Sequence, residues 1–261
     1  MAYQNIIVER EDGVATLTVN RPSVLNALND ATVAELIAAF DDLAGDEGVK
    51  VVIVTGAGEK AFVAGADINE LRAMKTSQDA IDKVTKGHRL MRKIENLRQP
   101  VIMAINGYAL GGGSELALAG DIRIAADTAR MGLPEINLGM IPGFGGTQRL
   151  PRVVGKSTAK LMIFTGDHIT ADDAYRLGLV DKVVPAAELM TFVNDLAKKI
   201  ASKAPIALAM AKKSVNEGVE VDIDRALAIE TGYGTIAQMS EDRIEGTSAF
   251  LEKRRPQWKG R

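Results

Sequence analysis

Two hydrophobic patterns alternate along the first 185 residues of the chain. Residues 13–19 alternate apolar and polar side chains with the two-residue period of a half-buried strand. Residues 78–97 carry apolar side chains at the spacing of an amphipathic helix, which ends ahead of Pro100. Apolar runs predict buried strands at residues 49–55 and 101–105, and further strands are predicted at residues 121–125 and 179–184. This alternation of strands and helices predicts an α/β fold.

A further helix is predicted early in the chain. Thr32 and Glu35 have the Thr-x-x-Glu spacing of a capping box, and apolar residues follow at helical spacing as far as Leu43. We therefore expect this helix to begin at the capping box.

The pattern changes near residue 186, after which we find helical periodicity and no convincing strand. One of these helices opens at Pro205, because proline is favoured in the first helical turn. We therefore predict an α/β core that holds the candidate site, at residues 1–195, and a C-terminal helical region at residues 196–261.

Composition limits the possible functions. The chain has 261 residues, 46% of them hydrophobic, and a net charge of -2 without clustered Lys and Arg, so a nucleic-acid surface is not expected. It has no cysteine, which excludes disulfides, thiolate metal sites and cysteine nucleophiles. Neither a signal-peptide pattern nor an apolar run of about 20 residues is present, so we expect a cytoplasmic protein without membrane contact.

Two glutamates stand out against these neutral features. Glu115 follows the glycine-rich turn at residues 111–113 and falls in the first turn of a predicted helix, among apolar neighbours. Glu135 lies between Pro134 and Pro142 in another apolar segment, which suggests that it is buried. Each glutamate could have a simpler role: Glu115 could stabilise the N-terminus of its helix electrostatically, and Glu135 could be an ordinary surface residue. Two carboxylates with perturbed pKa values would instead suit proton transfer near pH 7.

The glycine-rich turns supply a second kind of chemistry. The N–H of Gly112 would lie at a helix N-terminus, where negative charge is favoured. The small-residue turn at residues 64–67 could offer a second backbone donor to the same oxygen. Each such donor contributes about 3–4 kcal/mol when charge develops on a carbonyl oxygen. The sequence thus predicts acid–base chemistry next to a carbonyl group.

Other motifs are incomplete. Residues 56–61 match a dinucleotide-binding variant but lack the helix that should follow, and residues 155–157 match only the end of a phosphate loop. Two histidines, His88 and His168, lie far apart in the sequence and indicate no metal site. We interpret residues 143–147 as the turn that opens a helix.

Taken in order, the motifs resemble those of the crotonase (enoyl-CoA hydratase/isomerase) superfamily. The segments that carry the resemblance are residues 20–22, 61–68, 106–116, 134–142 and 249–254. The resemblance implies the ClpP/crotonase spiral of ββα units, with a C-terminal helical region used in oligomerisation. It also implies an acyl-CoA thioester substrate and a homo-hexamer built as a dimer of trimers.

The same resemblance assigns roles to residues. It implies that Glu115 and Glu135 are catalytic and that the N–H groups of Ala66 and Gly112 form an oxyanion hole. The implied substrate-binding residues are Ala64, Ala66, Asp67, Ile68, Asn69 and Gly112.

Two further positions follow from the resemblance. Asn69 stands where lysine is common in relatives, so a cation for the CoA phosphates is missing there. Phe250 and Lys253 match tail positions that reach the CoA of a neighbouring subunit. Acyl-chain length would depend on pocket depth, set by residues such as Leu71 and Met74.

The expected activity is hydration of a trans-2-enoyl-CoA to a 3-hydroxyacyl-CoA, with no metal or redox cofactor. We assign Glu115 to the water and Glu135 to the proton at C2, although both could share one water as a coupled pair. A Δ3,Δ2-enoyl-CoA isomerase is the alternative enzyme and needs only one acid. An RNA-binding homologue is a third possibility, but Asp79, Asp82 and Glu95 dilute the basic residues of the helix at 78–97.

Overall fold

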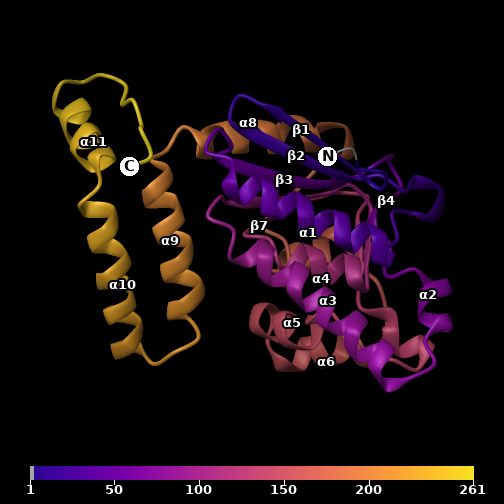
Figure 1. The fold of residues 1–261 in the computed structure, drawn as a ribbon. Coiled ribbons are helices and arrows are strands. Elements are labelled where there is room, and N and C mark those ends of the chain that lie inside the picture. The colour runs from indigo at the N-terminus through magenta and orange to yellow at the C-terminus, as the bar shows by residue number, and fades with distance from the viewer. Residues whose placement is uncertain (1–2) are drawn as a thin grey trace.

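A computed structural model describes residues 3–261 and divides them into an α/β core and a helical tail (Figure 1). The core contains two sheets. The first sheet has the strand order β1-β2-β3-β5-β7-β10, in which β1 and β2 are antiparallel and the other pairs are parallel. Its strands are β1 (Ile6–Glu11), β2 (Val14–Val19), β3 (Val51–Gly56), β5 (Val101–Ile105), β7 (Ile122–Ala126) and β10 (Lys182–Val184).

The second sheet is made of short strands that follow those of the first. Its order is β4-β6-β8-β9, and β4, β6 and β8 run parallel to one another. These strands are β4 (Ala61–Val63), β6 (Tyr108–Leu110), β8 (Arg130–Gly132) and β9 (Ile169–Thr170). The chain therefore places one strand in each sheet before it continues into a helix, and it does so three times. This is the expected spiral of ββα units.

The core helices pack around these sheets. They are α1 (Asp30–Gly45), α2 (Ile68–Ala73), α3 (Ser77–Glu95), α4 (Gly112–Leu118), α5 (Gly146–Val154), α6 (Lys156–Thr165), α7 (Ala171–Arg176) and α8 (Leu189–Ala201). Single 3-10 turns lie at Pro22–Val24, Pro134–Leu138 and Ala186–Glu188. All six residues of β3 are buried, as its unbroken apolar pattern predicts.

The predicted start of the first helix was wrong. Helix α1 begins at Asp30, and its cap is Asn29, whose side chain accepts a hydrogen bond from the N–H of Thr32 at 2.8 Å. The carboxylate of Glu35 instead accepts the N–H of Asn5, also at 2.8 Å. Asn29, three residues before Thr32, is an equally good capping residue. The local sequence pattern alone therefore did not decide between Asn29 and Thr32 as the cap.

The helical tail comprises α9 (Pro205–Gly218), α10 (Ile223–Gln238) and α11 (Glu241–Leu251), which stand apart from the core in Figure 1. Helix α8 runs across residue 195 and packs against the first sheet, so the chain leaves the core only after Ala201. The buried ammonium of Lys212 joins α9 to the core by bonding Asp121 at 2.7 Å. No helix among the described residues combines the length and the apolarity needed to cross a bilayer.

Helix α4 approaches β4 closely, and only glycine fits at the contact. A Cβ on Gly113 would lie 1.9 Å from the carbonyl oxygen of Val63. We expect Gly113→Ala to lower the free energy of unfolding by roughly 3 kcal/mol, because rigid backbone must move. Urea unfolding followed by circular dichroism measures this. The matched variant Gly45→Ala, which meets nothing within 4 Å, should change stability little. Equal stability of the two variants would contradict the close packing.

Candidate active site

Three loops that are distant in sequence meet at one edge of the second sheet. Residues 64–67 follow β4, residues 111–115 follow β6, and residues 133–135 follow β8. These strands are parallel neighbours, so their carboxyl ends lie at the same edge, where open α/β sheets bind ligands. A cavity of about 570 Å³ opens there, and its lining includes Ala66, Gly112, Glu115 and Glu135. The structure thus brings together the candidate groups of the sequence.

The carboxylate of Glu115 is held by the loop that precedes α5. Its Oε1 accepts hydrogen bonds from the N–H groups of Phe144 and Gly146, both at 2.7 Å. A Cβ on Gly146 would lie 3.0 Å from the same oxygen, so the absence of a side chain allows this approach. Sequence analysis predicted correctly that residues 143–147 open a helix, but it missed these two donors.

The pKa of Glu115 reflects competing effects. The side chain is 2% exposed, and its burial raises the pKa to about 7 despite the N–H of Gly146, which lowers it. The negative charge of Glu135 raises the pKa further, whereas the N–H of Phe144 and the guanidinium of Arg149 lower it. Glu115 can therefore exchange a proton near neutral pH.

Glu135 faces the same cavity from the 3-10 turn after β8. It approaches the turn before α4 so closely that a Cβ on Gly111 would lie 2.8 Å from its Oε1. Its Oε2 is buried and has no hydrogen-bond partner among the described residues. Burial raises the pKa of Glu135, as the apolar segment suggested. One oxygen of this carboxyl group is thus available to a ligand or a water molecule.

Two backbone N–H groups lie near these carboxylates. Ala66 pairs with Leu28 in a single parallel bridge, which uses the carbonyl of Gly65 and the N–H of Asp67. Within residues 3–261, the N–H groups of Ala66 and Gly112 have no hydrogen-bond partner. A Cβ on Gly112 would lie 3.7 Å from the nitrogen of Ala66, so the two groups are neighbours. They can donate together to one ligand oxygen.

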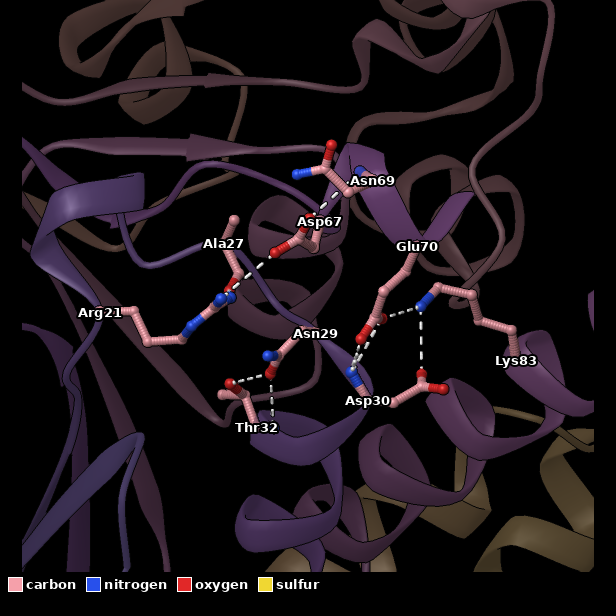
Figure 2. Close-up of polar contacts among 9 residues, drawn as sticks. All are labelled: Arg21, Ala27, Asn29, Asp30, Thr32, Asp67, Asn69, Glu70 and Lys83. Carbon is pink, nitrogen blue, oxygen red and sulfur yellow. Dashed lines mark hydrogen bonds and ion pairs between the residues drawn. The ribbon is translucent and has the colours of Figure 1, made fainter. Parts of the chain in front are cut away.

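Helix α2, which follows Ala66, is held at its N-cap and in its first turn (Figure 2). At its start, Asp67 pairs with Arg21 at 3.2 Å and accepts the N–H of Asn69 at 3.1 Å. Further along, Glu70 bonds the ammonium of Lys83 at 2.7 Å and the N–H of Asp30. The carboxylate of Asp67 is therefore engaged within the protein.

The other predicted contacts divide into two groups. Ala64 and Ile68 line the cavity, as do Leu71 and Met74. The remaining predicted residues are not part of its lining: Asp67, Asn69, Phe250 and Lys253. Of these, Phe250 lies near the C-terminal end of α11 in the tail, and it is 84% exposed.

Residues 9–261 match the family model described as Enoyl-CoA hydratase/isomerase. The chain therefore belongs to this family. It is 48% identical over 255 residues to a short-chain-enoyl-CoA hydratase from Clostridium acetobutylicum, with 98% of this chain and 97% of the relative covered. It is 47% identical to a crotonyl-CoA hydratase from Syntrophomonas wolfei, with 98% of both chains covered.

Solved structures agree with this assignment. The crystal structure of an enoyl-CoA hydratase from Bacillus anthracis superposes with a TM-score of 0.96 at 44% identity, covering 99% of this chain and all of the other. The resemblance and the fold class expected from the sequence are confirmed.

The mutual influence of the two glutamates can be tested by titration. Because the charge of Glu135 raises the pKa of Glu115, Glu135→Gln should lower the pKa of Glu115 from its value of about 7. Carboxyl ¹³C chemical shifts measured against pH report this. The control is Glu188→Gln, an exposed residue outside the cavity, which should leave the titration unchanged. An unchanged pKa in Glu135→Gln would show that the two groups do not interact.

Proposed function

We propose that the protein catalyses the reversible syn addition of water to a trans-2-enoyl-CoA, giving a 3-hydroxyacyl-CoA. One observation carries this proposal: the buried Glu115 and the half-buried Glu135, which come from separate elements, share a cavity with two neighbouring, unpaired N–H groups. The family membership and the hydratase relatives support the substrate class.

The proposed oxyanion hole consists of the N–H groups of Ala66 and Gly112. Attack of water at C3 moves negative charge onto the thioester oxygen, which would accept both N–H groups. Fixed donors stabilise that charge without reorganising during the reaction. Gly112 adds the positive end of helix α4 on the same side.

The two glutamates would handle the protons. Oε1 of Glu115 takes both bonds from the 144–146 loop, which leaves Oε2 to orient and deprotonate the attacking water. Glu135, whose pKa is raised by burial, would donate a proton to C2. Turnover then leaves Glu115 protonated and Glu135 ionised, so a proton must pass between them before the next cycle. This redox-neutral step needs no metal or redox cofactor, and CoA is part of the substrate.

Two basic residues of α3 form ion pairs within the chain. Lys83 bonds Asp30 and Glu70, and Lys93 pairs with Asp41. These pairs leave less free charge for a phosphate backbone, which favours the enzyme over the RNA-binding alternative.

Removing either acid should reduce the rate. We expect Glu115→Gln and Glu135→Gln each to lower kcat by about 10²–10⁴, because each variant loses one proton-transfer group. Loss of the conjugated enoyl-thioester absorbance measures the rate, and Glu188→Gln is again the control. Wild-type rates in either variant would sink the two-acid mechanism. Conversion of a 3-enoyl-CoA to a 2-enoyl-CoA without hydration of the product would instead identify an isomerase.

We also propose a cytoplasmic homo-hexamer, a dimer of trimers assembled through the tail. Helix α10 has no buried residue in the single chain, and even its apolar side chains are exposed, Ile223 at 70% and Leu227 at 52%. Exposed apolar faces of this kind favour association. In the assembly, Phe250 and Lys253 would contact CoA bound to a neighbouring subunit.

Sedimentation equilibrium tests the assembly. The native mass should be six times that of one chain, and Leu227→Asp should shift it to smaller species because a charge is buried at the interface. A monomeric wild-type protein at micromolar concentration would contradict the hexamer. Cell fractionation tests the location, since activity in the membrane fraction would contradict it.

A further inference from the structure

The orientation of the Ala66 peptide depends on a segment that precedes it by almost forty residues. The N–H of Ala64 donates to the carbonyl of Leu25 at 3.0 Å. Beyond Ala66, the N–H of Asp67 donates to the carbonyl of Leu28 at 2.9 Å. Hydrogen bonds to residues 25–28 therefore flank Ala66 on both sides, and the direction of its N–H depends on the position of this segment.

Residues 25–28 do not hold this position through regular structure. Leu25 and Asn26 both lie in the left-handed region, with φ of 53° and 59°. Asparagine adopts this backbone more readily than most residues, but for Leu25 it is unfavourable and persists only where surrounding contacts fix it. One contact is the side chain of Asn26, which is fully buried and donates to the carbonyl of Ala61 at 2.8 Å.

The second fixed point is the guanidinium of Arg21, which bridges the two segments (Figure 2). Its Nη1 donates to the carbonyl of Ala27, and its Nη2 donates to the carboxylate of Asp67 at 3.2 Å. The side chains of Arg21 and Asp67 are only 17% and 15% exposed, so solvent screens the pair weakly. Arg21 thus closes a ring of contacts around the peptide that carries Ala66.

The same segment, residues 25–28, also lies beside the second donor, the N–H of Gly112. The Cδ1 of Leu28 lies 3.7 Å from the position of a Cβ on Gly112. Residues 25–28 are therefore attached to one N–H donor through hydrogen bonds and packed beside the other. A displacement of this segment would change the spacing between the two donors.

We propose that Arg21 is a positioning residue that sets the direction of the Ala66 N–H toward the thioester oxygen. The inference rests on the proposed oxyanion hole. Arg21 contacts Ala27 and Asp67 rather than the cavity, so it acts through the backbone it holds. Since thioester charge grows in the transition state, misdirected donors reduce kcat more than they raise KM.

Kinetics of Arg21→Met test this. The variant keeps the aliphatic stem but loses both donors, and we expect kcat to fall about 10–100-fold while KM changes less than about threefold. Arg21→Lys should lose less activity, although one ammonium cannot reproduce the planar fork. The control is Arg10→Met, because Arg10 pairs with Asp42 and Asp46 at the surface, and it should retain wild-type kinetics.

A spectroscopic measurement separates positioning from general loss of structure. Butanoyl-CoA labelled with ¹³C at the thioester carbonyl has no double bond to hydrate. On binding to the wild-type protein, its carbonyl stretch should shift to lower frequency, because two donors polarise the bond. In Arg21→Met the stretch should return toward its frequency in water, and Arg10→Met should match the wild type.

The outcomes distinguish this inference from the hydratase proposal. Wild-type kcat in folded Arg21→Met, or reduced kcat with an unchanged carbonyl stretch, would overturn the role of Arg21 and leave the hydratase intact. A wild-type protein without hydratase activity would refute the proposed function, yet the carbonyl shift would still decide the role of Arg21. If Arg21→Met does not fold, Arg21→Lys and Asp67→Asn carry the same measurements.

Discussion

Burial of the Glu115 carboxylate is the constraint on which the site depends. A carboxylate that is 2% exposed must find hydrogen bonds within the protein or bind a proton, and Glu115 combines the two. The N–H groups of Phe144 and Gly146 bond one of its oxygens, which fixes their loop against α4. Phe144 in turn packs over Gly87 of α3, where a Cβ would lie 2.1 Å from its ring. The contacts that adjust the acid therefore also join α4, α5 and α3 around the cavity.

The second sheet explains why residues so far apart in sequence meet. Each of its parallel strands has only three residues, and each is followed at once by a loop that carries a site group. Parallel neighbours place these loops side by side without long excursions of the chain. The strand that precedes each of them in the chain, β3, β5 or β7, lies in the first sheet, and β3 and β5 are fully buried. Acid–base groups and backbone donors are thus located by strand pairing, and helices only refine their orientation.

Much of this arrangement could be predicted from local sequence patterns. The hydrophobic patterns located five of the six strands of the first sheet but missed β1, and the small-residue turns with their glutamates identified four groups of the cavity. The start of α1 was mistaken because Asn29 and Thr32 are both capable caps and tertiary contacts chose between them. The donors to Glu115 lie 29 and 31 residues beyond it, and no period or spacing encodes such a pairing. The contact of Arg21 with Asp67, 46 positions away, likewise could not be predicted from local sequence.

Strand register gives this fold a particular kind of evolvability. Pairing between β4, β6 and β8 can change only by whole residues, and a one-residue slip would turn every side chain to the opposite face. The two N–H donors belong to the main chain and depend on strand pairing, so the side chain at 135, whose Oε2 has no partner among the described residues, can be exchanged while both donors stay in place. Diversification on such a scaffold would keep the means of holding a carbonyl oxygen and alter what happens to the carbon atoms beside it.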